Sequence, residues 1–119
     1  MDKKLRGSAG EAHALKWLKK KGYAPVGMGY RSRYGEIDLI VKDRQYIVFV
    51  EVKLRKDSRF AEAREFVHAA KQGRILKTAQ QYLAEHETNL QPRFDVIEIY
   101  APEGAREKDY IVNHIENAF

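Results

Sequence analysis

Apolar residues recur at helical spacing in two stretches of the chain. The first stretch predicts a helix over Ser8–Lys21. Its apolar stripe consists of Ala9, Ala12, Leu15 and Leu18, with Trp17 beside them. Ser8 can cap the first turn, with Glu11 three residues later as its capping-box partner, and Gly22 ends the helix. The second stretch predicts a helix over Phe66–His86.

The other stretches have the composition of strands. Glu36–Val41 and Tyr46–Leu54 are rich in β-branched residues, and Lys42–Gln45 between them predicts a hairpin turn. Tyr23–Tyr30 is interrupted by a proline and two glycines, which is typical of an edge strand. Further strands are predicted over Phe94–Tyr100 and, at an edge, over Asp109–Ile115. The order α-β-β-β-α-β, with one more strand, predicts an α/β fold with a mixed central sheet flanked by helices.

The central hairpin changes character along one face. Because side chains alternate between the two faces of a strand, an even-numbered hairpin loop places Asp38 on the same face as Glu51 and Lys53. The opposite face is apolar throughout and is expected in the core; it comprises Ile37, Leu39, Val41, Val48, Val50 and Val52. A bulge in either strand would break this parity.

The face that carries Asp38 is apolar near the turn and charged away from it. Its apolar part comprises Ile40, Ile47 and Phe49, and its charged part Glu36, Asp38, Glu51 and Lys53. A partly buried carboxylate needs a partner. The residues leave two partners open, which are a divalent cation and an ion pair between Glu51 and Lys53.

Composition restricts the classes of function. The 119 residues fit one domain over residues 1–119, and the absence of cysteine excludes disulfides and thiolate metal sites. No apolar stretch has the length of a signal peptide or a membrane span, so we expect a soluble, cytoplasmic protein with no membrane partner. The net charge of +5 suits either a polyanionic partner or a well-solvated surface.

Asp38, followed by Glu51-Val52-Lys53 on the next strand, resembles the nuclease signature PD-(D/E)xK. Over nearly its whole length the chain also resembles the YraN-type family of small bacterial proteins (UPF family 0102). The matching segments are Gly7–Ala12, Gly35–Ile40, Val48–Arg55, Lys71–Ala79 with Tyr82-Leu83, and Arg93–Val96. Ile37 replaces the proline of the signature, as is usual in this family. The resemblance implies a restriction-endonuclease-like αβββαβ core, which agrees with the order of elements above.

The resemblance also implies a Mg²⁺ or Mn²⁺ site. Asp38 and Glu51 would be its carboxylate ligands, and the backbone carbonyl of Val52 a third ligand. Lys53 would orient or deprotonate the attacking water. Such cations prefer oxygen ligands and leave positions for water and phosphate.

Two further residues have two interpretations each. Similarity to archaeal Holliday-junction resolvases implies that Glu11 is a metal or water ligand, whereas the capping box makes it a structural residue. Lys71 matches the basic residue that such nucleases aim at the site from the second helix, but it also suits a solvated helix position. Asp95 is interpreted as structural, paired with Arg93. None of the histidines has ligand spacing with the acids, and a surface position is expected for His13, His68, His86 and His114.

Several basic residues lie on segments that adjoin the acidic rim. The candidate phosphate contacts are Arg31, Arg33, Arg55, Lys56 and Arg59. The leading hypothesis is an endonuclease for DNA, ahead of RNA, with branched or structured DNA as the substrate. A homodimer is plausible because a junction resolvase needs two sites. The alternatives are a catalytically silent nucleic-acid-binding module and an RNA-directed nuclease.

Overall fold

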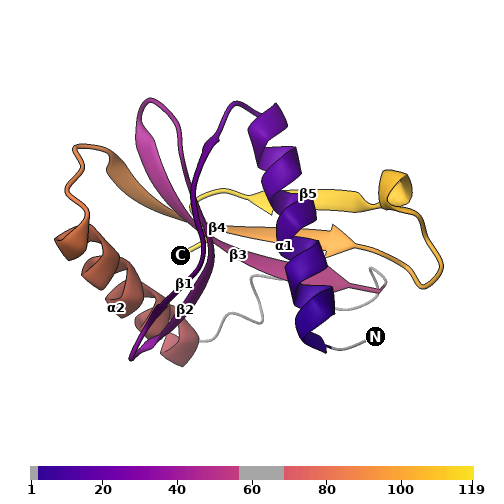
Figure 1. The fold of residues 1–119 in the computed structure, drawn as a ribbon, viewed down its shortest axis with the longest axis horizontal. Coiled ribbons are helices and arrows are strands. Elements are labelled where there is room, and N and C mark those ends of the chain that lie inside the picture. The colour runs from indigo at the N-terminus through magenta and orange to yellow at the C-terminus, as the bar shows by residue number, and fades with distance from the viewer. Residues whose placement is uncertain (1–2, 57–68) are drawn as a thin grey trace.

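The computed structural model describes residues 3–56 and 69–119, and in the first segment it describes side chains from residue 9 onward. Five strands form one mixed sheet in the order β1-β2-β3-β4-β5, flanked by two helices (Figure 1). The elements are α1 (Lys3–Lys20), β1 (Ala24–Ser32), β2 (Gly35–Lys42), β3 (Tyr46–Arg55), α2 (Ala69–Glu85), β4 (Gln91–Tyr100), the 3-10 helix η2 (Glu107–Asp109) and β5 (Ile111–Ile115). The predicted α/β fold class is confirmed, and the arrangement is consistent with a restriction-endonuclease-like core.

Strands β1, β2 and β3 form an antiparallel meander, and β4 then pairs in parallel with β3. A parallel pair needs a long crossover connection, and α2 lies within it. β5 adds antiparallel to β4. The predictions that the first and last strands lie at the edges are therefore confirmed.

The hairpin between β2 and β3 has the even-numbered loop that the parity argument needs. Lys42 pairs with Ile47, so four residues lie between the paired positions. The Asp43 carboxylate holds the turn, since it accepts hydrogen bonds from the backbone N–H groups of Gln45 (2.9 Å) and Tyr46 (2.7 Å). Ile40 consequently pairs with the buried Phe49. Glu51 and Lys53 follow Phe49 on the same face of β3 at intervals of two residues.

Both faces of the central strands are buried, each under a different helix. The first cluster packs against α1 and includes Leu39, Val41, Val48 and Val50 of the sheet with Ala14 and Leu18 of the helix. The second packs against α2 and includes Ile40, Ile47 and Phe49 of the sheet with Ile75 and Tyr82 of the helix. Each fully buried large apolar side chain stabilises the fold by about 1.5–3 kcal/mol. Within the described residues, neither helix is both long enough and apolar enough to cross a bilayer.

The prediction for Ile37 was wrong. It was expected on the face of Leu39, but it packs in the α2 cluster together with Ile40. The pairing of β2 with β3 ends at Leu39 and Val50, and the β1–β2 hairpin curls away from β3 toward α2 (Figure 1). Freed from its neighbour, the first part of β2 follows the twist of the hairpin rather than the face pattern of the sheet.

Contacts with α2 fix the far end of this hairpin. The Ser32 hydroxyl lies 2.8 Å from the buried Thr78 hydroxyl and also accepts a hydrogen bond from the backbone N–H of Tyr34 (3.0 Å). A Cβ atom on Gly35 would lie 3.6 Å from the Cβ of Arg74, so the hairpin backbone runs close to the helix. These contacts with α2 hold the end of β2 that has separated from β3.

The predicted cap at Ser8 was also wrong. The helix begins at Lys3, so Ser8 lies within it and Glu11 is not its capping-box partner. The residues before Ser8 include Lys3, Lys4 and Leu5, which are good helix formers and extend the helix beyond the apolar stripe. Glu11 is left available for other contacts.

Candidate functional site

Where β2 separates from β3, an opening lies between the two strands. Five ionisable side chains from four elements lie at this opening. Asp38 extends from β2, Glu51 and Lys53 from β3, Glu11 from α1 and Lys71 from α2. Asp38 interacts with both Glu11 and Glu51, while Lys71 interacts with both Glu51 and Lys53. The structure thus brings together all five residues that the sequence singled out as catalytic candidates.

Asp38 is anchored where the main-chain ladder between β2 and β3 stops. Its Oδ2 accepts a hydrogen bond from the backbone N–H of Val52, at 2.8 Å. In a strand, the N–H and C=O groups of one residue point to the same side. The Val52 carbonyl is therefore directed into the same opening between the strands as the Asp38 carboxylate.

Glu51 is a buried acid whose Oε1 has no hydrogen-bond partner in the described part of the chain. The residue is 3 % exposed, and among the described residues its ion-pair partner is Lys71, whose Nζ lies 3.8 Å from Oε1. Burial raises the pKa of Glu51 to about 9, and the hydrogen bond with Asp38 and the repulsion from it act in the same direction. Lys71 and Lys53 oppose this shift but do not cancel it. The metal-free protein thus holds a proton on Glu51 at neutral pH.

Glu11 is a second acid of the same site with a raised pKa. Burial raises the pKa of Glu11 to about 7, with further contributions from the charge of Asp38, the hydrogen bond with Asp38 and the charge of Glu36. Asp38 is the shared neighbour of Glu11 and Glu51. Neighbouring carboxyl groups resist ionising together without a cation to offset their charge.

Lys53 has the opposite perturbation. Burial lowers the pKa of Lys53 to about 8, and the hydrogen bond with Lys71 and the repulsion from it add to this effect. Glu51 and Asp38 act against the shift. A lysine with a pKa this close to neutral can release or accept a proton near physiological pH, which is the property required of a general acid or base.

The oxygen donors of this site are few. Within residues 3–56 and 69–119, no three His, Cys, Asp or Glu side chains lie together in a position to hold a metal ion. Asp38, Glu51 and the Val52 carbonyl form a smaller, all-oxygen set, which suits Mg²⁺ or Mn²⁺ because such ions keep several water ligands. The unpartnered Glu51 oxygen and the retained protons are what such a set shows without its cation. The residues present therefore fit a hard divalent ion held by few protein ligands.

The predicted phosphate contacts that lie within the described residues differ in their exposure. Arg31 is exposed and pairs through its Nε with the Glu36 carboxylate, at 3.2 Å. Arg33 is also exposed and donates a hydrogen bond of 2.7 Å to the Tyr34 hydroxyl. Lys56 is exposed and Arg55 is half-buried, whereas Arg59, like His68, lies outside the described residues.

Two basic residues near the hairpin were missed by the sequence analysis. Arg74 and Lys77 are exposed on α2, and the Lys77 Nζ lies 5.3 Å from the centre of the Tyr34 ring. They follow Lys71 at intervals of three residues, which places the three on neighbouring positions of one helix surface. That spacing was the signal that could have identified them.

The predictions for two histidines were wrong. The His114 side chain is 3 % exposed and forms a hydrogen bond of 2.6 Å with Asp95, while His13 is half-buried and bonded to Glu107. His86 is exposed, as expected. The pairing of Asp95 with Arg93 is confirmed, at 2.9 Å and 2.8 Å. The burial of His114 depends on contacts with α1 and β4, which its local sequence does not reveal.

Comparison with known proteins adds family relationships. The profile of the uncharacterised protein family UPF0102 matches residues 10–99. A UPF0102 protein of Alkaliphilus oremlandii (strain OhILAs) is 45 % identical over all of this chain and all of its own length. One from Caldanaerobacter subterraneus subsp. tengcongensis is 45 % identical, with 100 % of this chain and 98 % of that protein covered. One from Nitrosomonas europaea is 40 % identical, with 96 % and 92 % covered.

Proposed function

Because the chain belongs to the uncharacterised protein family UPF0102, whose similarity extends through Glu11, Asp38, Glu51 and Lys53, we propose one activity for the site that these residues form. The protein is a Mg²⁺- or Mn²⁺-dependent endonuclease that hydrolyses phosphodiester bonds in DNA, with branched or structured DNA as its substrate, in the cytoplasm. The observation that carries the proposal is the buried, unpartnered Glu51 oxygen beside Asp38, with two lysines facing the same opening.

The roles follow from position. Asp38, Glu51 and the Val52 carbonyl would hold the cation, and Glu11 would hold a water beside it or act as a further ligand. When bound, the cation would polarise the scissile phosphate and lower the pKa of the attacking water.

The two lysines take the remaining roles in the proposed reaction. Lys53, with its lowered pKa, would orient that water and accept or return its proton. Lys71 would offset the negative charge that builds up on the phosphate.

Basic side chains around the opening would bind the DNA backbone. Arg31, Arg33 and Lys56 are exposed beside the site, and Arg74 and Lys77 extend the same charge along α2. Backbone contacts of this kind weaken steeply with salt and carry no sequence information. Resolving a junction requires a cut in two strands, so we propose that two copies of the chain act together on that substrate.

The test is cleavage of a labelled panel in Mn²⁺ or Mg²⁺, comprising a four-way junction, a flap, a duplex, single-stranded DNA and matched RNA. We expect the wild type to cut a structured DNA, and Asp38→Asn to lose at least about a hundredfold in rate, as when a key charge-stabilising group is removed. Asparagine keeps the oxygen that accepts the Val52 N–H. The exposed Asp109→Asn is the matched control and should retain full activity. Equal cleavage by the wild type and Asp38→Asn would refute the role of Asp38 as a metal ligand. Preferential cleavage of the RNA would mean that the substrate is RNA and not DNA.

One observation favours a second candidate, a catalytically silent nucleic-acid-binding module. Among the described residues no three acids or histidines form a ready-made metal cluster. Salt-sensitive DNA binding, with no cleavage and no metal-induced rise in melting temperature, would establish the binding module in place of the nuclease.

A further inference from the structure

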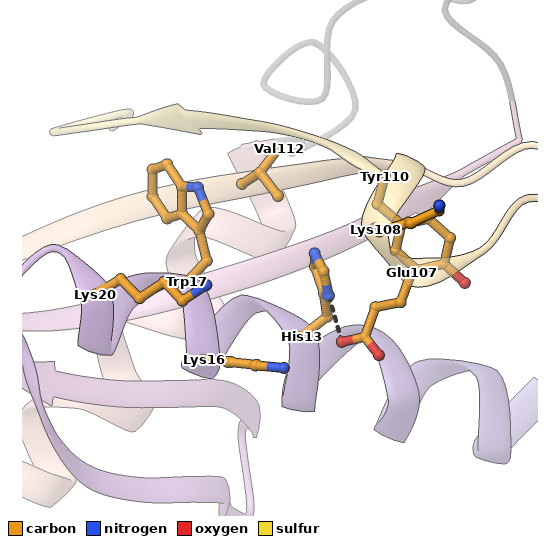
Figure 2. A pocket seen from close by; sticks show the side chains of 8 residues that line it. All are labelled: His13, Lys16, Trp17, Lys20, Glu107, Lys108, Tyr110 and Val112. Atoms are coloured by element: carbon orange, nitrogen blue, oxygen red, sulfur yellow. Dashed lines mark hydrogen bonds and ion pairs between the residues drawn. The ribbon is translucent and has the colours of Figure 1, made fainter.

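A second basic surface lies away from the candidate site, in a groove between α1 and the segment that enters β5. The groove encloses about 510 Å³, a volume typical of ligand sites. Figure 2 shows side chains from both walls directed into it. Its lining comprises His13, Lys16, Trp17 and Lys20 from α1, with Glu107, Lys108, Tyr110 and Val112 opposite. The four helix residues recur at intervals of three, one and three positions, so they form one stripe of α1.

The side chains that line this groove carry a net positive charge. Within the described residues, the ammonium groups of Lys16, Lys20 and Lys108 form no ion pair. The single carboxylate of the lining, Glu107, already accepts a hydrogen bond of 2.8 Å from His13 (Figure 2). That bond, together with the charge of Lys16, lowers the pKa of Glu107. Three lysines of the groove are therefore available to a ligand, whereas the Glu107 carboxylate is bonded to His13.

Aromatic surface lies between these cations. Trp17 and Tyr110 both line the groove, on opposite walls, and Tyr110 is held by an edge-to-face contact with His13 at 5.1 Å between ring centres. Trp17 is similarly braced by the buried His114, at 5.4 Å. Rings fixed in this way and interleaved with lysines are the combination by which proteins stack bases and neutralise phosphates of single strands.

We propose that this groove binds a single-stranded segment of nucleic acid, with bases against Trp17 and Tyr110 and phosphates against Lys16, Lys20 and Lys108. The candidate active site and the groove share α1, since Glu11 and Trp17 lie roughly 9 Å apart along the helix axis. The groove would therefore hold a strand that leaves the substrate near the reacting phosphate. This inference shares with the proposed function a nucleic-acid partner, but it needs no metal ion and no cleavage.

Trp17 is the only tryptophan of the chain, so tryptophan fluorescence reports on this one residue of the groove. The experiment titrates the full chain with oligothymidylate in EDTA, and follows quenching together with the anisotropy of a labelled oligonucleotide. We expect saturable quenching by the oligonucleotide. Lys20→Gln should weaken binding severalfold and reduce the salt dependence of log K by roughly 0.7, the value for one phosphate contact on a single strand. Lys19→Gln, an exposed neighbour that does not line the groove, is the matched control and should match the wild type.

Three results would overturn the proposal. The first is oligonucleotide binding by anisotropy with unchanged Trp17 emission. The second is equal affinity for thymidine monophosphate, which would make the groove a site for free nucleotides. The third is equal quenching by polyglutamate, which would make it a site for acidic polypeptides. Asp38→Asn separates this proposal from the nuclease, since it should abolish cleavage and leave the quenching intact.

Discussion

Two buried carboxylates on neighbouring strands, Asp95 on β4 and Glu51 on β3, have opposite surroundings. Asp95 accepts hydrogen bonds from the Arg93 guanidinium at 2.9 Å and 2.8 Å, from the His114 Nε2–H at 2.6 Å and from the backbone N–H of Asn117 at 3.0 Å. Burial alone would raise the pKa of Asp95, but the bonds from His114, Arg93 and Asn117 outweigh it and hold the pKa below its usual value. Asp95 is thus fully ionised and fully bonded inside the protein.

Glu51 is buried to nearly the same extent but lacks such donors. Its Oε1 has no hydrogen bond in the described part of the chain. Its neighbour Asp38 is another acid, and the pKa of Glu51 rises to about 9. A buried acid that the fold satisfies is a structural element, whereas one that the fold leaves unsatisfied is stable only as a protonated group or with an added cation. The comparison therefore separates a structural carboxylate from a candidate ligand by their donors, since burial is the same for both.

The largest effect is expected at the lysine beside Glu51. Lys53→Met keeps the length and apolar stem of the side chain but removes its proton, so cleavage should fall by about 10²–10⁴-fold, the usual contribution of a positioned acid or base. The metal-induced rise in melting temperature should remain, because methionine leaves the oxygen ligands in place. Single-turnover cleavage and thermal melting with Mn²⁺ measure the two effects. Loss of the metal effect together with cleavage would assign Lys53 a structural role.

The next effect concerns stability at the bonded carboxylate. Asp95→Asn removes the negative charge that the Arg93 guanidinium contacts. Leaving this buried cation without its partner should destabilise the fold by about 3–5 kcal/mol. Urea unfolding at neutral pH measures this change. The exposed Asp109→Asn serves as the control and should change stability by less than about 0.5 kcal/mol. A loss below about 1 kcal/mol at Asp95 would mean that the network is replaceable.

A smaller effect is expected when the cation is supplied. Mn²⁺ or Mg²⁺ at a hundred times its Kd should stabilise the wild type by about 2.7 kcal/mol, as ligand linkage requires. Glu51→Gln should abolish this gain without destabilising the metal-free protein, because a neutral amide replaces an acid that is already protonated. Glu87→Gln, at an exposed position, should retain the gain. An undiminished metal effect in Glu51→Gln would exclude Glu51 as a ligand.

The last effect is the pH dependence of the metal-free protein. Glu51 and Glu11 have raised pKa values of about 9 and about 7 in the folded state, against a usual value of 4.5. Between pH 5 and 7 the folded protein therefore binds more protons than the unfolded chain, and its stability should fall as the pH rises. Asp95 acts in the opposite direction, since its lowered pKa gives a contribution that is lost only as the pH falls below its usual 3.8. Urea unfolding across this range should show a flatter slope in Glu51→Gln than in Glu87→Gln.

Much of the site could be predicted from local periodicity. The even-numbered loop between β2 and β3 pairs Ile40 with Phe49, as the parity argument required, and strand composition predicted the order of the elements. The face of the sheet on which Ile37 lies and the burial of His114 could not be predicted in this way. Ile37 depends on the point where β2 leaves β3, and His114 depends on contacts with strands and helices distant in sequence. Such features arise from tertiary packing, which local patterns do not encode.

The parallel pairing of β3 with β4 has a consequence for the order in which the chain assembles. The β2–β3 hairpin is local and can form quickly, but β4 can join only after a long segment containing α2 has closed. Asp38 and Glu51 therefore meet early in folding, while Lys71 arrives late with α2. In the newly formed β2–β3 hairpin, Asp38 and Glu51 would remain exposed to water until the connection containing α2 has closed and β4 has paired with β3. Closure of this crossover is the step that covers the acids, so we expect the refolding rate to respond to pH and to divalent salts.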